Sequence, residues 1–162
     1  AYAISPGADV WLRMVELSAA NNWPEFDTIW KSGSQFQADH PQTQLLRVEY
    51  FFHTGSLADA KALADSLLDS QTNPWIRAGA EIWLGRISLE EGDYHSARRG
   101  FQKIRLLYQD FPEVHSEACH YYIISLVKLG ETHEARLALT EYRHLFSDVQ
   151  ADEIEALLNN GR

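Results

Sequence analysis

Residues 74–112 read PWIRAGAEIWLGRISLEEGDYHSARRGFQKIRLLYQDFP, and this stretch decides the fold. It opens with a proline, keeps an apolar pattern of helical period as far as Gly92, and then begins a second such pattern. Proline fits the first turn of a helix, where its missing N–H would bond nothing, and glycine tolerates the left-handed conformation that ends a helix. The stretch therefore predicts two helices, 74–91 and 93–109, joined by a tight turn.

The same pattern recurs along the chain. Prolines precede amphipathic runs at Pro6, Pro41, Pro74 and Pro112, and turn residues follow at Asn21, Gly55, Gly92 and Gly130. Five, nine and twelve places after each turn residue stand Phe26, Ala60, Ala97 and Ala135, then Trp30, Ala64, Phe101 and Leu139, then Gly33, Leu67, Ile104 and Tyr142. These offsets form one stripe on a helix of 3.6 residues per turn, so every second helix has the same packed face.

The predicted helices are 6–20 and 23–38, 41–53 and 56–70, 74–91 and 93–109, 112–129 and 132–147, and a last short helix at 149–159. Ser5 and Asn73 precede two of the prolines and are predicted to cap the helix starts. No segment has the period-two alternation of a strand, so the predicted fold is all-α. With 162 residues, the chain has about the length of one domain. We expect a single domain, 1–162, with repeats at about 6–40, 41–73, 74–111 and 112–148 and a capping helix at 149–159.

The third repeat resembles a tetratricopeptide repeat (TPR) in Ala80, Leu84-Gly85, Gly92-Asp93-Tyr94, Ala97, Phe101 and Ile104, with Pro112 opening the next helix. The fourth repeat has Tyr122-Ile123 where the family has Leu-Gly, and the first has Phe26 in a small-residue position. The resemblance implies a right-handed α-solenoid of about four helix pairs. It also implies that the first helices of the pairs line an inner face that binds a peptide or helix of a partner.

The spacing of the repeats bears on localisation. Two intervals between turn residues, 37 and 38, exceed the TPR period of about 34. These longer repeats, with the join Tyr108–Pro112, resemble those of bacterial envelope TPR proteins, including outer-membrane assembly lipoproteins. The likeness favours the bacterial periplasm or cell envelope over the cytoplasm.

Charge and composition exclude several classes of protein. The net charge of −9 disfavours a nucleic-acid or anionic-membrane partner, because both reward a basic face. The longest apolar run, Tyr121–Val127, is far shorter than the roughly 20 residues of a membrane-spanning helix, so we expect no membrane insertion. The start, Ala1-Tyr2-Ala3, lacks the basic and apolar regions of a signal peptide and is compatible with a processed form or a fragment.

The sequence contains few of the motifs that are typical of catalytic, phosphate-binding or metal-binding sites. The chain has no His-Glu-x-x-His, no Gly-rich phosphate loop and no Gly-x-Ser-x-Gly. Glu117 and His120 share a helix face, but no third metal ligand is indicated. Cys119 lies in the most apolar helix, where a buried and inert thiol is expected. We therefore predict no catalytic residue, no metal and no cofactor, and hence no enzyme.

Arg98, Arg99, Lys103 and Arg105 make the predicted helix 93–109 locally basic. Two interpretations stay open for these four cations. They form salt bridges to neighbouring acidic helices, or they bind an acidic segment of a partner.

The predicted inner face lies ten, six and three places before each turn residue. It comprises Trp11, Leu45, Ile82 and His120, then Val15, Glu49, Arg86 and Ile124, then Ser18, Phe52, Leu89 and Val127. Eight of these twelve are apolar or aromatic, with Glu49 and Arg86 expected side by side as a polar pair. The candidate binding residues are Trp11, Val15, Leu45, Glu49, Phe52, Ile82, Arg86, Leu89, His120 and Ile124.

Such an apolar face predicts a cover, either an external partner or a self-segment: the last helix, the N-terminal tail or a second copy. The sequence thus predicts a non-catalytic scaffold that binds a protein or peptide. The alternatives are a self-association module that forms homo-oligomers, or a regulatory domain of a larger enzyme or regulator.

Overall fold

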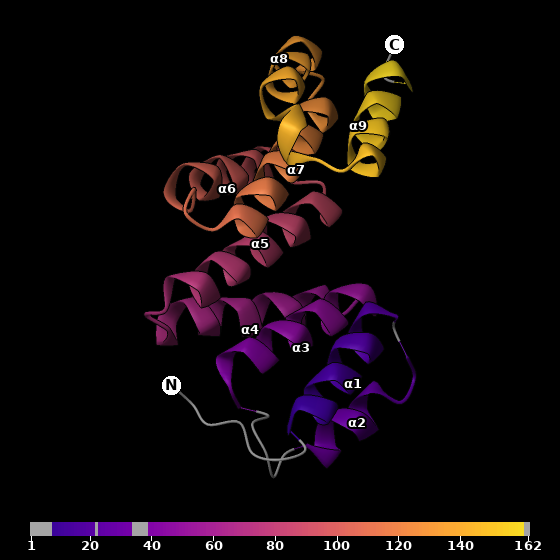
Figure 1. The fold of residues 1–162 in the computed structure, drawn as a ribbon, viewed down its shortest axis with the longest axis vertical. Helices are drawn as coiled ribbons and strands as arrows, with labels where there is room; N and C mark the ends of the chain where they lie inside the picture. The colour runs from indigo at the N-terminus through magenta and orange to yellow at the C-terminus, as the bar shows by residue number, and fades with distance from the viewer. Residues whose placement is uncertain (1–7, 22, 34–38, 161–162) are drawn as a thin grey trace. The chain divides into compact units, whose positions relative to one another are not determined.

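A computed structural model describes residues 8–21, 23–33 and 39–160 of the chain. Within these ranges the regular structure is helix alone, without strands (Figure 1). The helices are α1 (Ala8–Ala20), α2 (Phe26–Ser32), α3 (Pro41–His53), α4 (Leu57–Ser70), α5 (Pro74–Glu90), α6 (Tyr94–Leu107), α7 (Pro112–Lys128), α8 (Thr132–Tyr142) and α9 (Asp148–Asn160), with a 3₁₀ turn at Arg143–Leu145. The all-α prediction is confirmed for the described residues.

Several predicted helices are one to three residues longer than the observed ones, and two predictions, for α2 and α8, differ by more. α2 begins at Phe26 rather than at 23. Pro24 disfavours a helical conformation in Trp23, and residues 24–25 form a turn before the helix. The end predicted for this helix, at 34–38, lies outside the described residues. α8 stops at Tyr142 rather than continuing to 147, and Phe146 is extended. The ring of Phe146 is buried in the core, and the break in the helix places it there.

Helix starts follow the predicted proline and cap signals. Pro41, Pro74 and Pro112 are the first residues of α3, α5 and α7. Asn73 Oδ1 accepts a hydrogen bond from the backbone N–H of Trp75 at 2.9 Å, which satisfies one of the unpaired donors of α5. The predicted signals Ser5 and Pro6 lie outside the described residues.

Three glycines end the first helices of their pairs in the left-handed region, as predicted. Gly55, Gly92 and Gly130 have φ of 79°, 79° and 76°. At each turn the glycine N–H bonds the carbonyl three residues back, and the next N–H bonds the carbonyl five residues back. This is the Schellman arrangement, which satisfies carbonyls at a helix end. The same turn thus joins α3 to α4, α5 to α6 and α7 to α8.

The packed stripe on the second helix of each pair is also confirmed. Every position of the stripe is buried except Tyr142, which is half-buried. The buried positions are Phe26, Trp30 and Gly33 in the first pair, Ala60, Ala64 and Leu67 in the second, Ala97, Phe101 and Ile104 in the third, and Ala135 and Leu139 in the fourth.

The first turn departs from the predicted register by one residue. Asn21 still makes a helical hydrogen bond to the Leu17 carbonyl, and Trp23 makes the five-back bond, to Ser18 at 2.9 Å. The equivalent donors in the other turns are Ser56, Asp93 and Glu131. Eight residues before these four donors stand Val15, Val48, Gly85 and Ile123, all of them buried. The alignment on Asn21 is therefore wrong for α1, and Val15 takes a packed position.

The chain divides into two compact units, Ala1–Trp83 and Leu84–Arg162, with the boundary inside α5. We call them the N-terminal unit and the C-terminal unit. The sequence predicts one domain over 1–162, and whether the two units fold as one domain stays a prediction.

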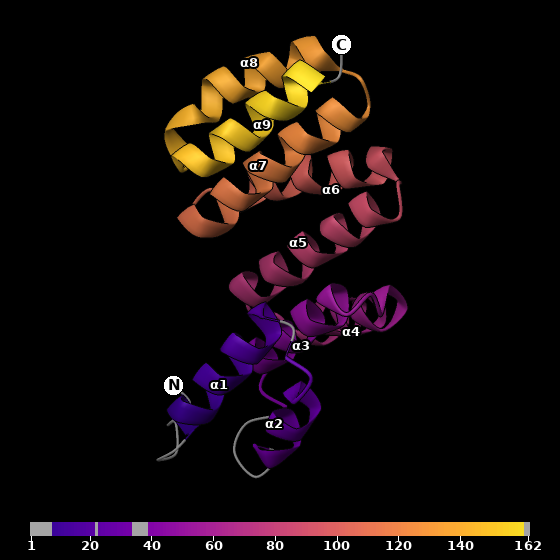
Figure 2. The same ribbon diagram turned by 90° about the vertical axis from the view of Figure 1, so that its right-hand side faces the viewer.

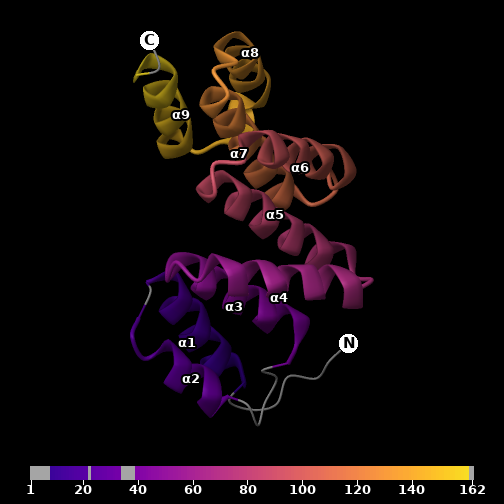
Figure 3. The same ribbon diagram turned by 180° about the vertical axis from the view of Figure 1, so that it is seen from behind.

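The N-terminal unit has a core rich in aromatic rings. α1 packs against α2 and α3, and α3 packs against α4 (Figure 3). Trp11, Val15, Phe26 and Trp30 form one buried cluster, and the Phe26 ring stacks on Tyr50 with centroids 3.7 Å apart. The indole N–H of Trp11 donates to the Ile29 carbonyl at 2.8 Å, so burying this ring leaves no polar atom unsatisfied.

In the C-terminal unit, α6 packs against α7, and α7, α8 and α9 lie side by side (Figures 1 and 2). The core of these three helices consists of Cys119, Ile123, Leu126, Ala135, Ala138, Leu139, Phe146, Ala151, Ile154 and Leu158. Gly85, in α5, faces the ring of Phe101, and a Cβ at Gly85 would lie 2.6 Å from that ring. The small residue thus permits a close approach of α5 and the Phe101 ring of α6.

Candidate functional site

A pocket of about 460 Å³ lies on one face of α7, next to the start of α9. It is lined by Pro112, Glu113, Ser116, Glu117, His120, Tyr121 and Gln150, and we call it the α7 pocket. Six of the seven residues belong to α7, at spacings of three and four that place them on one side of a helix. The opposite side of α7 carries core residues such as Cys119 and Ile123.

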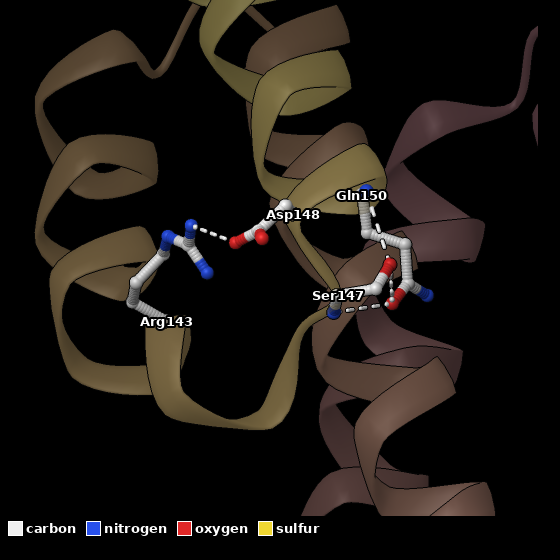
Figure 4. A network of polar contacts seen from close by, with 4 residues as sticks. All are labelled: Arg143, Ser147, Asp148 and Gln150. Atoms are coloured by element: carbon white, nitrogen blue, oxygen red, sulfur yellow. Dashed lines mark hydrogen bonds and ion pairs between the residues drawn. The ribbon is translucent and has the colours of Figure 1, made fainter.

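Gln150 is held at the pocket by the cap of its own helix (Figure 4). Its backbone N–H donates to Ser147 Oγ at 3.3 Å, and its side-chain Oε1 accepts from the Ser147 N–H at 3.1 Å. This reciprocal pair is a capping box, which satisfies two donors at the start of α9. Nearby, Arg143 pairs with Asp148 at 3.1 Å across the chain that leads into α9. The first turn of α9 is thereby fixed beside the pocket.

His120 lies at the base of the pocket and is only 5% exposed. Its Nε2 is 3.4 Å from Glu153 Oε2 of α9, and its ring contacts Tyr121 and Phe146 edge to face. Burial lowers the pKa of His120, and the Glu153 carboxylate opposes this effect. The His120 Nε2 is buried, and the Glu153 carboxylate is the polar group that it faces.

Arg86 approaches the α7 pocket from α5. Its guanidinium lies 5.1 Å from the centroid of the Tyr121 ring and 3.7 Å from Glu117 Oε1. Desolvation raises the pKa of Glu117, and the charge of Arg86 acts in the opposite direction. Desolvation also raises the pKa of Tyr121, so its phenol stays protonated at neutral pH.

Carboxylates outnumber cations around the pocket. Of the charged groups whose fields act on Tyr121, Glu117, Glu153 and Glu90 are carboxylates and Arg86 is the cation. Glu113 adds a further carboxylate to the pocket lining. The site therefore combines a negative potential with hydrogen-bond acceptors, a combination that favours a cationic donor.

Two predicted binding residues, Arg86 and His120, come together at this site. The neighbouring predicted residues on the same helices lie elsewhere. Ile124 is buried at 8% exposure and Leu89 is half-buried, and neither lines the α7 pocket.

The other six predicted residues belong to the N-terminal unit. Trp11 and Val15 are buried in the cluster with Phe26 and Trp30, so they pack α1 onto α2. Leu45 and Ile82 are also buried, and Leu45 lies against Gly79. Glu49 lies 3.9 Å from His53, and the ring of Phe52 packs on Trp83 at 5.3 Å. The expected pairing of Glu49 with Arg86 stays a prediction.

The list predicted from sequence omits Glu113, Ser116, Glu117, Tyr121 and Gln150. Helical spacing from His120 points to Glu113, Ser116 and Glu117, which lie seven, four and three residues before it on the same side of α7. Tyr121 lies four residues after Glu117 and follows from the spacing to that residue. Gln150 has no such signal, since its place depends on how α9 packs.

The basic residues of α6 have partners of two kinds. Arg98 makes a bidentate ion pair with Glu131, both bonds at 2.8 Å. Arg105 donates to the Tyr142 hydroxyl at 2.7 Å and covers the ring of Tyr122. The salt-bridge interpretation is confirmed for Arg98, whereas Arg105 contacts two tyrosines rather than a carboxylate.

Cys119 is fully buried, and burial raises the pKa of its thiol to about 12. The thiol therefore stays protonated at neutral pH, which supports the expectation of an inert cysteine. Within the described ranges, no three His, Cys, Asp or Glu side chains gather to form a metal site. No helix among the described residues has the length and apolar character needed to cross a bilayer.

The chain was compared with protein-family models, with curated proteins and with solved structures. None of the three comparisons finds a match.

Proposed function

We propose that this protein is a non-catalytic scaffold that binds a segment of a partner protein on the side of α7 that carries the pocket. The observation that carries the proposal is the α7 pocket itself. It lies on the first helix of a pair, beside α9, and it presents charged and aromatic groups outward. Such a pocket is suited to binding side chains of a partner protein. Its few polar groups can fix the orientation of the bound segment, and the Tyr121 ring supplies apolar contact area.

We also propose that the helix pairs are TPR-like repeats of a right-handed solenoid, with α9 as the capping helix. Three identical glycine turns and the recurring buried stripe support this reading. The apolar side of α9, through Ala151, Ile154 and Leu158, packs on α7 and α8 and leaves the polar side outward, as a capping helix does. A location in the bacterial periplasm or cell envelope is part of the same proposal and rests on the join Tyr108–Pro112.

Photo-crosslinking tests the scaffold. A photoreactive amino acid replaces Glu113, which is exposed at the pocket, and in a matched variant it replaces Glu134, which is exposed on α8. In extracts of the source cells, the variant at 113 should crosslink to one defined partner, and the variant at 134 should not. Crosslinks to that partner in equal yield at both positions, or none at 113, would contradict binding at this face.

Self-association is a second candidate, supported by a surface on α6. Leu106 and Leu107 are 58% and 63% exposed and, with Arg99, Gln102 and Lys103, line a hollow of about 350 Å³. Exposed leucines beside cations offer a surface to an acidic second copy. Light scattering over a range of concentrations distinguishes the candidates, because only self-association raises the molar mass with concentration.

A further inference from the structure

We propose that helix α6 of one copy of this chain packs on helix α8 of a second copy. This inference rests on self-association, the second candidate function above, and names the two surfaces that meet. The first surface, which we call the α6 hollow, is lined by Arg99, Gln102, Lys103, Leu106 and Leu107. The second surface, which we call the α8 patch, consists of the exposed residues Glu134, Leu137 and Glu141.

The α6 hollow combines apolar surface with positive charge. Leu106 and Leu107 are 58% and 63% exposed, and an apolar side chain of a second protein can fill the space of about 350 Å³ beside them. Lys103 lies three residues before Leu106 and Arg99 lies seven before it, so both cations share its side of the helix. An acidic segment that carries an apolar residue therefore fits this surface.

The cations of α6 divide between contacts within the chain and the hollow. Arg98 pairs with Glu131, whereas Arg99 and Lys103 are exposed at the hollow. Arg99 donates to the Ser96 hydroxyl on its own helix at 3.0 Å, a local contact of an exposed side chain. Such contacts contribute little to stability, so Arg99 can exchange this one for a carboxylate of a second copy.

The α8 patch has the complementary character. Leu137 is 60% exposed, with Glu134 three residues before it and Glu141 four residues after it, so a leucine lies between two carboxylates on one side of the helix. The opposite side of α8 carries Leu139, in the core. Glu141 also accepts from the Tyr142 phenol, and a carboxylate has lone pairs for a further donor.

The spacing on the two helices lets the apolar and the charged contacts form together. Lys103 lies three residues from Leu106, and a carboxylate lies three or four residues from Leu137 on either side, about 4.5–6 Å along the helix axis. When the two leucines meet, the carboxylate beside Lys103 is Glu134 in parallel helices and Glu141 in antiparallel ones. A charge pair therefore accompanies the leucine contact in both directions.

The occupant of the α6 hollow is a second copy because the chain itself carries the matching surface. Both surfaces are exposed in the single chain, so they do not cover each other within it. The net charge of −9 repels copies at long range, and association therefore depends on this local match. Each copy carries both surfaces, so the contact can form twice across a two-fold axis. Helix-on-helix contacts are small for an interface, and we expect a Kd on the order of 10–100 μM.

Charge reversal tests the pairing. One variant carries Arg99→Glu and Lys103→Glu, and the other carries Glu134→Lys and Glu141→Lys. Each variant alone brings like charges together in every contact of α6 with α8, so its self-association should be at least about tenfold weaker than that of the wild-type chain. An equal mixture of the two variants pairs opposite charges in every contact between unlike chains, so association should return. Analytical ultracentrifugation at concentrations around the expected Kd measures the molar mass.

A second pair of variants tests the apolar contact. Leu137→Ser should raise the Kd of self-association about tenfold, because the buried leucine contact is lost. Val149→Ser, at a position on α9 that is 78% exposed and outside both surfaces, should leave the Kd unchanged. Circular dichroism checks that every variant keeps the helical content of the wild-type chain.

Three results would overturn the inference. If either charge-reversed variant associates as strongly as the wild-type chain, or if the mixture associates no better than its components, self-association stands but uses another surface. If the wild-type chain is monomeric at every concentration, self-association fails as well. None of the substituted residues lines the α7 pocket, so the scaffold is judged separately by the crosslinks at position 113. With the purified chain, a photoreactive amino acid at position 134 should crosslink to a second copy, a product that differs in mass from a crosslink to the partner.

Discussion

At the scale of single residues, two helical glycines have opposite surroundings. A Cβ on Gly85 would lie 2.6 Å from the Phe101 ring, whose side chain is fully buried and has no free direction in which to move. A Cβ on Gly100, in the interior of α6, would meet nothing within 4 Å. The two positions share helical backbone and differ in packing, so they separate packing from helix propensity.

We predict that Gly100→Ala raises the free energy of unfolding by about 0.5–1 kcal/mol, because alanine restricts the unfolded chain and favours helix. Gly85→Ala has the same propensity gain but overpacks the Phe101 ring, which costs about 1–3 kcal/mol. Chemical denaturation monitored by circular dichroism compares the two midpoints. Equal midpoints for the two variants would show that α5 and α6 do not meet at Gly85.

At the scale of elements, α9 is held by two separate interactions. The capping box of Ser147 and Gln150 satisfies its first donors, and its apolar side packs through Ala151, Ile154 and Leu158 into the core of the C-terminal unit. The polar side of the same helix carries Glu153 to His120. The packing of α9 therefore supports both the core and the α7 pocket.

We predict that Ile154→Ala lowers the free energy of unfolding by about 2–5 kcal/mol, because Ile154 is fully buried and its loss leaves a cavity. Glu155→Ala, one position along on the exposed side, should change it by less than about 0.5 kcal/mol. Urea denaturation of both variants provides the comparison. A small effect of Ile154→Ala would mean that α9 does not pack on α7 and α8 in solution.

At the scale of the whole molecule, each unit has a core of its own. The apolar cluster of the C-terminal unit uses residues from α7, α8 and α9 and from the segment that joins α8 to α9. A chain segment with its own core and short connections has the properties of an independent folding unit.

We predict that a fragment of residues 74–162, which keeps α5 whole, folds on its own. Its backbone NMR spectrum should be dispersed, and the resonances of α7, α8 and α9 should match those of the full chain. Its unfolding should be cooperative. A fragment that is unfolded at neutral pH would instead favour the single domain predicted from the sequence.

Much of the fold could be predicted from the sequence because the decisive signals are local. A proline such as Pro112 begins a helix through the chemistry of its own ring, and a glycine such as Gly92 ends one because it alone adopts positive φ without strain. The stripe through Ala97 and Phe101 follows from helical period. These features need no knowledge of distant contacts.

The sequence by itself determined the helix pairs, their turns and their packed stripes, whereas the tertiary structure decided which faces stay open. Apolar period predicts that Leu45, Ile82 and Ile124 face a neighbour, but it does not distinguish a core contact from a binding surface, and all three are buried. The first turn lies one residue later than the register predicted from Asn21, and Val15 therefore lies in the core rather than on the predicted inner face. The meeting of His120 with Glu153 and Gln150 depends on the docking of α9, a contact across some thirty residues of chain that no local pattern encodes.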